Sequence, residues 1–287
     1  MSRSLAVCIV VYHSDVHWLG KTLASLRAAI DHARALALIG AVELRIVDNG
    51  AGECAAVGDR SEPAQTKSAI DSALWTLPGP GAIHYAYVAT PTNKGFGAGN
   101  NTGLAGTNAD FVLLLNPDVE LAVEAISNAV AHLDRESTSS AVTPVAQSPD
   151  GSAQFLVKRD PTVFALALRG FAPGWVKARF ARHLRDYDYS DVAFDTPIAD
   201  CRVVSGCWLL LRGDVWREVG GFDTGFFMYF EDFDLSQRIA KLARIDRVAN
   251  CRIVHAGGNA SRKGAKHIGM FVRSAARYFS KHGWRWV

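Results

Sequence analysis

The sequence has no apolar run that reaches the roughly 18 residues a membrane-spanning helix needs. The N-terminal apolar run at residues 5–12 is too short for a signal peptide, and no small-residue cleavage pattern follows it. We therefore expect a cytoplasmic protein. If it works at a membrane, it would lie on the membrane surface as a peripheral protein.

The sequence also has few cysteines and a small net charge. The five cysteines fit no CxxC or metal-knuckle spacing, which favours buried, reduced thiols over a metal centre or a disulfide scaffold. The formal net charge of +3 is too small to predict nucleic-acid binding, and we expect none. The charge is uneven, because no acidic residue follows Asp246. This basic tail predicts either a solvated face or a surface that meets phosphates or an anionic membrane.

The sequence does contain an alternation of strand-like and helix-like segments. Apolar, β-rich runs predict strands at residues 5–12, 42–50, 83–89, 111–116 and 251–258, and apolar spacing predicts helices at 15–38, 97–106, 120–133, 231–243 and 266–282. Residues 201–223 predict a strand, a short helix and a Gly-Gly turn, whereas 141–160 suggest only loop and strand fragments. The alternation predicts an α/β fold with a mostly parallel, Rossmann-like central sheet flanked by helices.

Polar residues follow the predicted strands at their carboxyl ends. Tyr12 follows the first strand, Asp48 the second, and Asn116 and Asp118 the fourth, while a glycine-rich stretch from Asn93 follows the third. A single polar tip is ordinary turn chemistry. In open α/β sheets, however, ligands bind at the carboxyl ends of the strands, so four polar tips on one edge predict a polar ligand.

The stretch NKGFGAGNNTG (93–103) contains four glycines. Glycines allow the backbone to approach a ligand, and the amides at a helix start can bind phosphate. The stretch does not match a dinucleotide fingerprint, because Asn100 stands at the third glycine position and the stretch follows the third strand, not the first. A flexible loop without a ligand is the alternative.

Asp118 is the best candidate ligand for a hard divalent cation, which proteins hold with one or two carboxylates and the phosphates of a substrate. Asn116 can add a neutral oxygen, and His255, at the end of a late strand, is a candidate second ligand. The alternative is structural, because Asn-Pro-Asp is a common turn and a lone histidine is more often a structural residue.

The stretch FFMYFEDFDLSQR (226–238) places Glu231, Asp232 and Asp234 at a helix start, after mostly aromatic residues. Capping and the helix dipole stabilise carboxylates there, which is the structural interpretation. Adjacent carboxylates beside an apolar wall can also have raised pKa values suited to general-base catalysis. Glu231 and Asp232 are therefore candidate catalytic residues.

Together these stretches resemble the inverting glycosyltransferases of the GT-A fold, family 2, and most closely the bacterial rhamnosyltransferases of O-antigen and cell-wall polysaccharide assembly. The resemblance covers roughly residues 5–260 and rests on VVYHSD, IVDNG, NKGFGAGNNTG, LLLNPDVEL, GGFDTGFFMYFEDFDLSQR and IVHAGG. It implies a GT-A domain at residues 1–262, with a nucleotide-sugar half at about 1–120 and an acceptor half at about 121–262. A basic amphipathic C-terminal helix at 263–287 would follow.

The resemblance also implies residue roles. Asp232 would be the catalytic base, with Glu231 beside it, and Asp118 and His255 would hold Mg2+ or Mn2+. The nucleotide sugar would be bound by Val11, Tyr12, Asp48, Asn93, Gly95, Phe96, Asn100, Asn116 and Asp118. One departure is that Asn116 replaces the first acid of the family's DxD motif, which leaves fewer protein charges on the metal.

The implied activity is metal-dependent sugar transfer with inversion. The favoured nucleotide-diphosphate sugar donor is dTDP-rhamnose, and the acceptor would be a saccharide or lipid-linked saccharide. The alternatives are a UDP-hexose donor or a non-catalytic nucleotide-sugar-binding protein. A sugar-nucleotide pyrophosphorylase would need a glycine-rich phosphate loop after the first strand, and YHSDVHW (12–18) is not one. The C-terminal helix would either lie in an anionic membrane interface or pack on the domain.

Overall fold

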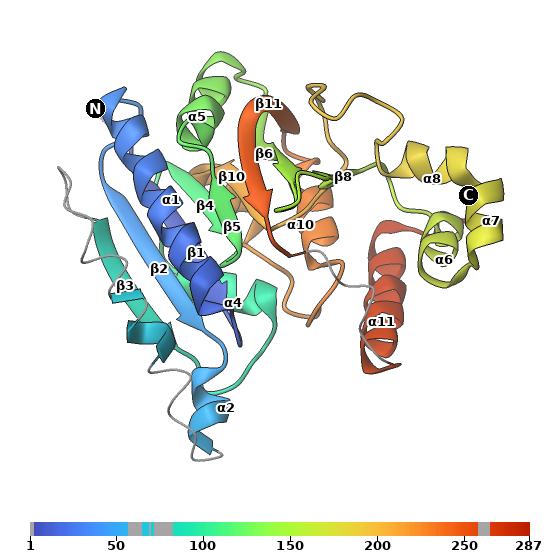
Figure 1. Cartoon of the computed structure of the whole chain (residues 1–287), viewed down its shortest axis with the longest axis horizontal. Helices are drawn as coiled ribbons and strands as arrows, with labels where there is room; N and C mark the ends of the chain where they lie inside the picture. Colours follow the sequence, from blue (N-terminus) through green and yellow to red (C-terminus); the bar gives the residue numbers. More distant parts are fainter. Residues whose placement is uncertain (1–2, 57–64, 69, 72–82, 258–264) are drawn as a thin grey trace.

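The first strand, β1 (Leu5–Val11), is buried along its whole length in the middle of a parallel run. The computed structural model describes residues 3–56, 65–68, 70–71, 83–257 and 265–287. In it, β1 pairs in parallel with β2 (Val42–Asp48) and β4 (Phe111–Leu115), and β3 (Ile83–Ala89) pairs in parallel with β2. This run, in the order β3-β2-β1-β4, brings the carboxyl ends of its strands to one edge (Figure 1).

Beyond β4 the sheet becomes mixed. β10 (Trp208–Arg212) lies antiparallel between β4 and β6 (Ser139–Gln147), and β11 (Arg244–His255) is parallel to β6. β5 (Val119–Leu121) pairs antiparallel with β11, and β7 (Ala153–Gln154) pairs antiparallel with β6. Within the described residues these strands form one nine-stranded sheet. The α/β fold class is therefore confirmed, with the longest parallel run in the first half of the chain.

Strand β6 corrects the expectation of loop and strand fragments at residues 141–160. Its sequence contains Pro144, which lacks the N–H for a ladder hydrogen bond and so argues against a central strand. The sheet accommodates this proline because β11 has an irregular register directly after Val248, the residue that pairs with Pro144. The short β5 was not predicted either. It overlaps the start of the helix that was expected at residues 120–133, and the helix observed there, α5 (Ala125–Arg135), begins later.

Helices cover both faces of the sheet. α1 (Val16–Ala35) and α5 lie side by side in front of the sheet in Figure 1, whereas α4 (Phe96–Gly103), α9 (Gly213–Val219) and α10 (Glu231–Ile239) contribute to the core on the other face. Successive β1 side chains alternate between these two cores. An unbroken apolar run therefore suits this strand, because both of its faces are buried.

The glycine-rich stretch after β3 forms α4, and two of its glycines make room for the sheet. A Cβ atom on Gly99 would lie 2.8 Å from the Val10 Cγ1 atom, and one on Gly103 would lie 2.5 Å from the Cys8 Sγ atom. Both distances are shorter than real Cβ contacts. These glycines therefore permit close helix–sheet packing, which is a different role from the flexible loop considered as the alternative.

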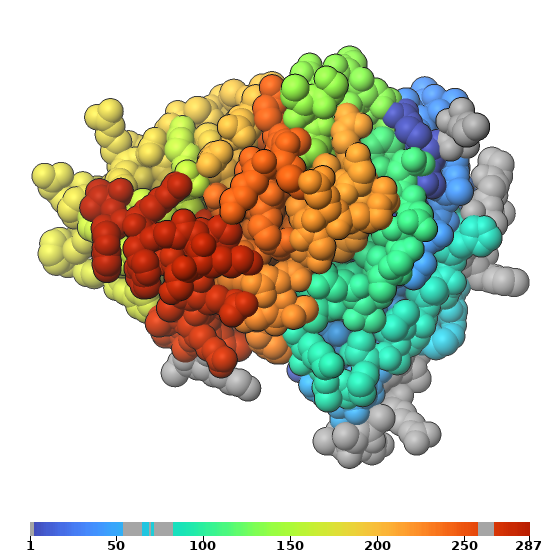
Figure 2. All heavy atoms as spheres, turned by 180° about the vertical axis from the view of Figure 1, so that it is seen from behind, coloured from blue at the N-terminus to red at the C-terminus, as the bar shows by residue number. Residues whose placement is uncertain are grey.

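A third, smaller core joins the C-terminal helix to the fold. On α11 (Ala265–His282), Tyr278 and Phe279 pack with Phe226, Phe230 and residues of α6 (Val163–Phe171) and α8 (Ala181–Tyr187). Figure 2 shows this helix, in red, against the orange part of the chain. The expected C-terminal helix is confirmed, while the expected domain boundary between residues 262 and 263 lies outside the described residues.

The remaining elements are short. α7 (Gly174–Arg179) lies between α6 and α8 in the chain, and β8 (Val157–Lys158) pairs antiparallel with β9 (Val203–Val204) as a second small sheet. α2 (Ala51–Ala56) follows β2, and much of the region up to residue 82 lies outside the described residues. No helix in the described ranges has the length and apolar content to cross a bilayer.

Alanine substitutions at two helix glycines should have opposite effects on stability. The methyl group added by Gly99→Ala would collide with Val10, so we expect the free energy of unfolding to fall by about 1–3 kcal/mol. Gly20 lies inside α1, and its Cβ position has no atom within 4 Å, so Gly20→Ala should raise that free energy by about 0.5–1 kcal/mol. Urea unfolding followed by circular dichroism measures both. Equal effects at the two positions would contradict the packing role of Gly99.

Candidate active site

The carboxyl end of β2 presents Asp48, whose side chain is held by its neighbours. Oδ1 accepts hydrogen bonds from the N–H groups of Gly50 (2.8 Å) and Ala51 (3.0 Å), and Oδ2 accepts one from the Tyr87 hydroxyl. Asp48 is buried, whereas Tyr12, directly after β1, is 43% exposed and lies beside Gly50. The two strand tips thus combine an exposed ring with a fixed carboxylate that still has a lone pair for another donor.

A glutamate that the sequence analysis missed ties this edge to the glycine-rich stretch. Glu53, on α2, accepts hydrogen bonds from the Tyr12 hydroxyl and from the Asn93 N–H, both at 3.2 Å. The Asn93 Oδ1 atom in turn accepts from the Gly95 N–H at 2.8 Å. No sequence signal marked Glu53, because the region from residue 51 to 80 shows no clear periodicity.

Gly95 brings the glycine-rich stretch against the segment that precedes α10. Its φ is +94°, and a Cβ atom there would lie 2.1 Å from the carbonyl oxygen of Phe227. The ring of Phe96 packs edge-on against Phe222, with ring centroids 5.7 Å apart, and borders Gly206. The residues after β3 therefore touch the part of the chain that leads to the candidate catalytic carboxylates.

Two of the residues expected to bind the nucleotide sugar are interior. Val11 and Asn100 are both buried, and the Asn100 Nδ2 atom donates to the Phe96 carbonyl at 3.1 Å. In the described part of the chain, the Asn100 Oδ1 atom has no hydrogen-bond partner. Both side chains lie in the interior of the fold.

Asp118 and His255 meet where β5 pairs with β11. Val119 is the pairing partner of His255, and the Ala256 N–H donates to the Asp118 carbonyl at 2.9 Å. This backbone pairing sets the His255 Nε2 atom 3.5 Å from the Asp118 Oδ1 atom. The fold thus brings together the two residues that were expected to bind a metal.

This pair fits a divalent cation. The Asp118 Oδ1 atom is buried and, among the residues described, has no hydrogen-bond partner. Gly257 keeps the space open, because a Cβ atom there would lie 2.5 Å from Asp118 Oδ2 and 2.8 Å from His255 Nε2. No group of three or more His, Cys, Asp or Glu residues suited to a metal occurs in the described ranges. The other ligands of a cation would therefore be phosphate oxygens and water, as is usual for magnesium.

The turn at Gly206 and Cys207 lies between the strand end that carries Asn116 and Asp118 and the candidate base Asp232. The Cys207 carbonyl accepts from the Asn116 N–H at 2.8 Å, and the Gly206 N–H donates to Asp232 Oδ2 at 3.4 Å. Burial, together with the nearby carboxylates of Asp118 and Asp232, raises the pKa of the Cys207 thiol to about 12. Two consecutive residues thus contact Asn116 on one side and Asp232 on the other. No sequence pattern marked this turn.

Glu231 and Asp232, the carboxylate pair, begin α10 with raised pKa values. Burial raises the pKa of Asp232 to about 6, against hydrogen bonds from the N–H groups of Gly206 and Phe233. Burial and the neighbouring Asp232 charge raise the pKa of Glu231 to about 8. The Glu231 Oε2 atom is buried without a hydrogen-bond partner in the described ranges. The N–H donors of Gly206 and Phe233 favour the charged form of Asp232, so we expect Asp232 to ionise before Glu231 and to be the acid that can accept a proton.

The backbone directly before the carboxylate pair is strained. Tyr229 and Phe230 have φ values of +68° and +64°, a left-handed conformation that costs a non-glycine residue roughly 1–2 kcal/mol. Helix α11 holds this turn: the Ser274 hydroxyl donates to the Met228 carbonyl at 2.8 Å, and the ring of Phe271 packs on that of Phe230 at 5.2 Å between centroids. The C-terminal helix therefore helps to fix the start of α10.

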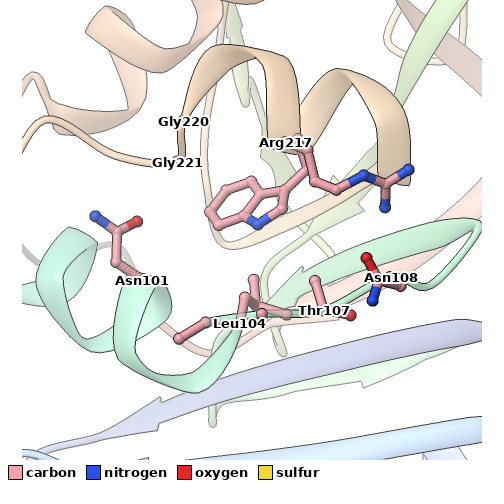
Figure 3. A pocket seen from close by; sticks show the side chains of 10 residues that line it. Asn101, Leu104, Thr107, Asn108, Arg217, Gly220 and Gly221 are labelled. Carbon is pink, nitrogen blue, oxygen red and sulfur yellow. The ribbon is translucent and has the colours of Figure 1, made fainter.

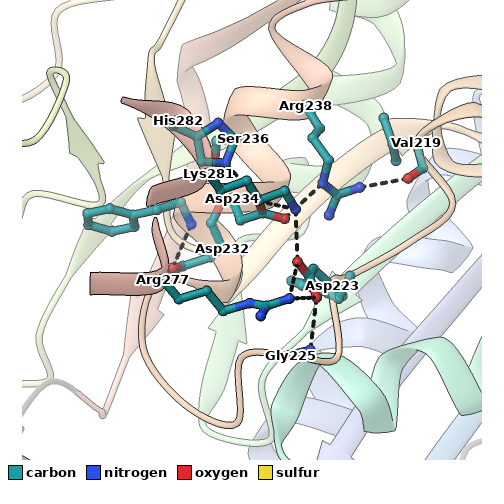
Figure 4. A network of polar contacts seen from close by, with 12 residues as sticks. Val219, Asp223, Gly225, Asp232, Asp234, Ser236, Arg238, Arg277, Lys281 and His282 are labelled. Atoms are coloured by element: carbon teal, nitrogen blue, oxygen red, sulfur yellow. Dashed lines mark hydrogen bonds and ion pairs between the residues drawn. The ribbon is translucent and has the colours of Figure 1, made fainter. Parts of the chain in front are cut away.

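Ion pairs anchor α11 to both ends of the segment around the carboxylate pair (Figure 4). The fully buried Asp234 carboxylate binds Lys281 (2.7 Å), His282 (2.8 Å) and Arg238 (2.8 Å). Burial would raise the pKa of Asp234, but the hydrogen bonds from Lys281 and His282 and the Arg238 charge outweigh burial and hold the pKa below its ordinary value. At the other end, Asp223 binds Lys281 and Arg277 at 2.9 Å each.

A surface cavity of about 300 Å3 lies apart from these residues, between the ends of α4 and α9 (Figure 3). Its described lining residues include Asn101 and Arg217. They include none of the residues expected to bind the nucleotide sugar or the metal, or to act as the catalytic base. Asn101 bonds to both the N–H and the carbonyl of Phe222 at 2.8 Å. This region therefore braces the ring on which Phe96 packs.

The sequence matches a known family and two curated proteins. Residues 6–199 match the profile of Glycosyl transferase family 2. The N-acetylglucosaminyl-diphospho-decaprenol L-rhamnosyltransferase of Mycobacterium tuberculosis is 26% identical over 180 residues, which cover 61% of this chain and 57% of that protein. Rhamnosyltransferase WbbL of Escherichia coli K12 is 24% identical over 196 residues, which cover 65% of this chain and 70% of that protein. The chain thus spans little more than half the length of the mycobacterial relative.

Solved structures of glycosyltransferases share the fold. The mannosyltransferase PcManGT from Pyrobaculum calidifontis, in complex with GDP-Man and Mn2+, matches with a TM-score of 0.54 at 15% identity, covering 99% of this chain and 76% of that one. GalNAc-T7 with UDP, GalNAc and Mn2+ matches with a TM-score of 0.59 at 15% identity, covering 88% and 43%. At these identities the likeness shows the fold alone, and it confirms the expected GT-A architecture.

Removing the Asp234 charge should destabilise the protein in a pH-dependent way. Asp234→Asn leaves its cationic neighbours without their shared carboxylate, so we expect a loss of about 3 kcal/mol in the free energy of unfolding at pH 7. Because folding lowers the pKa of Asp234, its stabilising contribution is complete above the ordinary value of 3.8 and is lost as the pH falls below that value. The difference in the free energy of unfolding between the variant and the wild type, measured by urea titration, should therefore become smaller below pH 4.

The control is Asp71→Asn, which breaks the exposed Lys67–Asp71 pair. This variant should change the free energy of unfolding by less than about 1 kcal/mol at either pH. An equally small loss for Asp234→Asn at pH 7 would contradict the anchoring role of Asp234.

Proposed function

The chain belongs to glycosyltransferase family 2 and is a glycosyltransferase, and we propose that it is a metal-dependent inverting enzyme that moves L-rhamnose from dTDP-rhamnose to a lipid-linked saccharide. The observation that carries this proposal is the turn at Gly206 and Cys207, which contacts Asn116 and Asp232 through consecutive residues. A donor diphosphate and an acceptor hydroxyl would meet the protein on the two sides of this turn.

The strand tips would hold the nucleotide. The remaining lone pair of Asp48 can accept a hydrogen bond from the N3–H of a pyrimidine base, and the exposed Tyr12 ring offers that base a surface for stacking. Asn93, Gly95 and Phe96 would border the sugar. The donor would thus bind to the half of the domain at about residues 1–120, and the acceptor to the half at about 121–262.

Asp118 and His255 would hold Mg2+ or Mn2+. The ion would neutralise the negative charge that develops on the departing diphosphate. Asn116 stands where the family motif has an acid. Its N–H donates to the Cys207 carbonyl, and this hydrogen bond would help to fix the backbone next to Asp118. The Mn2+ in the two structures of similar fold supports a divalent metal without choosing between the two ions.

Asp232 would act as the general base. It would take the proton of the acceptor hydroxyl while that oxygen attacks the anomeric carbon of the donor sugar. The bond from this carbon to the diphosphate oxygen breaks in the same step, and its electron pair leaves with the nucleoside diphosphate. Attack from the face opposite the leaving group inverts the configuration without a covalent enzyme intermediate. Glu231, whose pKa is raised by burial and by the Asp232 charge, would ionise after Asp232 and leave Asp232 as the charged member of the pair.

The choice of donor and acceptor rests on the two relatives. Both are named rhamnosyltransferases, and the mycobacterial name specifies an N-acetylglucosaminyl-diphospho-decaprenol acceptor. A lipid-linked saccharide acceptor would place the enzyme on the cytoplasmic face of the inner membrane. A UDP-hexose donor is the second candidate, since GalNAc-T7 of similar fold was solved with UDP.

The surface around α7 supports a peripheral membrane contact. Trp175 is 77% exposed and Phe171 56% exposed, with Lys177 and Arg179 on the same short helix as Trp175. Figure 2 shows the yellow part of the chain projecting from the outline on this side. Exposed aromatic rings among basic side chains suit the headgroup region of an anionic leaflet.

Exchange of the two acids for their amides should separate their roles. Asp232→Asn should abolish transfer, whereas Glu231→Gln, which resembles the protonated acid, should lower the rate no more than about tenfold. In the wild type, kcat should fall as the pH drops through about 6, because Asp232 then becomes protonated. A radiolabelled-sugar transfer assay between pH 5 and 9 measures this. Near-normal transfer by Asp232→Asn would contradict the base assignment.

Donor binding should depend on the metal through Asp118. A ligand that binds the native state raises the melting temperature, so dTDP-rhamnose with Mn2+ should shift the wild type and should lose most of that effect in EDTA. Asp118→Ala should show a weak shift that is equal with and without Mn2+. Asp214→Ala, at an exposed acid on α9, is the matched control and should behave as the wild type.

The same screen discriminates the alternatives. A shift with a UDP-hexose and none with dTDP-rhamnose would identify the second candidate donor. Metal-dependent binding by a wild type that transfers no sugar to any lipid-linked acceptor would support a non-catalytic nucleotide-sugar-binding protein.

A further inference from the structure

We propose that Gln154 is a positioning residue that fixes His255 in the one tautomer whose Nε2 lone pair faces Asp118, and thereby prepares the protein's half of a divalent-cation site. The proposal rests on the metal dependence proposed above. It assigns a role to a residue of β7 that no sequence pattern marked.

The orientation of the Gln154 amide follows from its neighbours. One amide atom lies 2.8 Å from the His255 carbonyl oxygen and 3.2 Å from the Gly257 carbonyl oxygen. Carbonyl oxygens only accept hydrogen bonds, so this atom must be the donor, Nε2. The Ser148 hydroxyl, at 2.9 Å, is its third neighbour. The other amide atom is therefore the oxygen, Oε1.

The amide orientation in turn decides the imidazole tautomer. Gln154 Oε1 lies 2.9 Å from His255 Nδ1 and can only accept, so Nδ1 must carry the hydrogen. In the neutral ring Nε2 then carries a bare lone pair. A metal-binding histidine commonly has its second ring nitrogen oriented by such an acceptor.

The Nε2 lone pair faces a second acceptor, and the part of the chain that the structure describes places no donor on that acceptor. Nε2 lies 3.5 Å from Asp118 Oδ1, which has no hydrogen-bond partner among the described residues. This separation is long for an N–H···O hydrogen bond. It is compatible with two ligand atoms of one cation whose bonds are about 2.1 Å long. A shared cation would satisfy both atoms.

The backbone around Gln154 holds this arrangement in place. Gln154 pairs with Ala146 across β7 and β6, and the Ser148 N–H donates to the Ser152 carbonyl at 2.8 Å within the connecting turn. The amide also bonds to the carbonyl of the histidine that it orients. A single side chain thus links β7 to the end of β11 and to Gly257, two residues after His255.

The first experiment reads the tautomer directly, without nucleotide, sugar or metal. Long-range 1H–15N correlation spectra of the imidazoles, with His255→Ala to identify the signals among the nine histidines, should show His255 with the hydrogen on Nδ1. Gln154→Met, which is similar in length but has no acceptor, should abolish this preference. A hydrogen on Nε2, or a doubly protonated ring, in the wild type at pH 8 would overturn the proposal.

The second experiment measures the consequence for the cation. Mn2+ broadens the signals of nearby nuclei, so titration with Mn2+ alone should broaden the His255 resonances. Gln154→Met should require a 10- to 100-fold higher Mn2+ concentration than the wild type for the same broadening. The matched control is Gln237→Met, which also removes a hydrogen bond to a backbone carbonyl, that of Arg202 at 3.2 Å. This control should respond to Mn2+ as the wild type does.

The outcomes separate this inference from the proposed function. Equal Mn2+ sensitivity in Gln154→Met and the wild type, or no broadening of His255 in either, would overturn the role of Gln154 even if the enzyme transfers sugar. A locked tautomer with the expected loss of Mn2+ sensitivity would uphold it even if dTDP-rhamnose is not the donor.

Discussion

The left-handed turn at Tyr229 and Phe230 is the constraint on which the rest of the site depends. It sets the direction in which α10 begins and therefore where the carboxylate pair points. Its conformational cost of roughly 1–2 kcal/mol per residue must be offset by contacts, and the third core supplies them through the rings of α11. The carbonyl of the preceding Phe227 also packs on Gly95, so the donor-side stretch and the C-terminal helix both contact this segment. The C-terminal helix is thus part of the support of the site.

Amphipathicity alone could not decide whether the C-terminal helix packs on the domain or lies on a membrane, because both require an apolar stripe. The structure divides that stripe: Tyr278 and Phe279 are buried, while Val272 is 51% exposed. The basic tail is divided in the same way, since Arg277 and Lys281 are occupied by Asp223 and Asp234 within the fold. Packing therefore accounts for one face of α11. Among the described residues, the aromatic side chains that are more than half exposed are Phe171 and Trp175, at and next to α7, and Trp284 and Trp286.

The sequence predicted features that a few neighbouring residues define and missed those that need two distant segments. A polar residue after an apolar run located Asp48, Asn116 and Asp118 at strand tips. Their arrangement depends on pairings with no local pattern: β5 is three residues long, yet it places Asp118 beside His255. Glu53, Gly206 and Gln154 were missed because each has a role only through a partner far along the chain. Asn100, which was expected to bind the nucleotide sugar, is fully buried, and the sequence could not show this because its burial depends on the packing of α4 on the sheet.

The environment of the carboxylate pair differs from that of ordinary capping carboxylates, which was one of the two interpretations that the sequence left open. Carboxylates that cap a helix accept N–H hydrogen bonds at an exposed end, and these lower their pKa values. Here Phe230 occupies the cap position without a side-chain hydrogen bond, and burial raises the pKa values of both acids. The first charge to form is that of Asp232, which has N–H donors from Gly206 and Phe233; this charge then opposes ionisation of Glu231. Such an arrangement costs stability, since a buried charge is unfavourable, and helix capping alone would not require it.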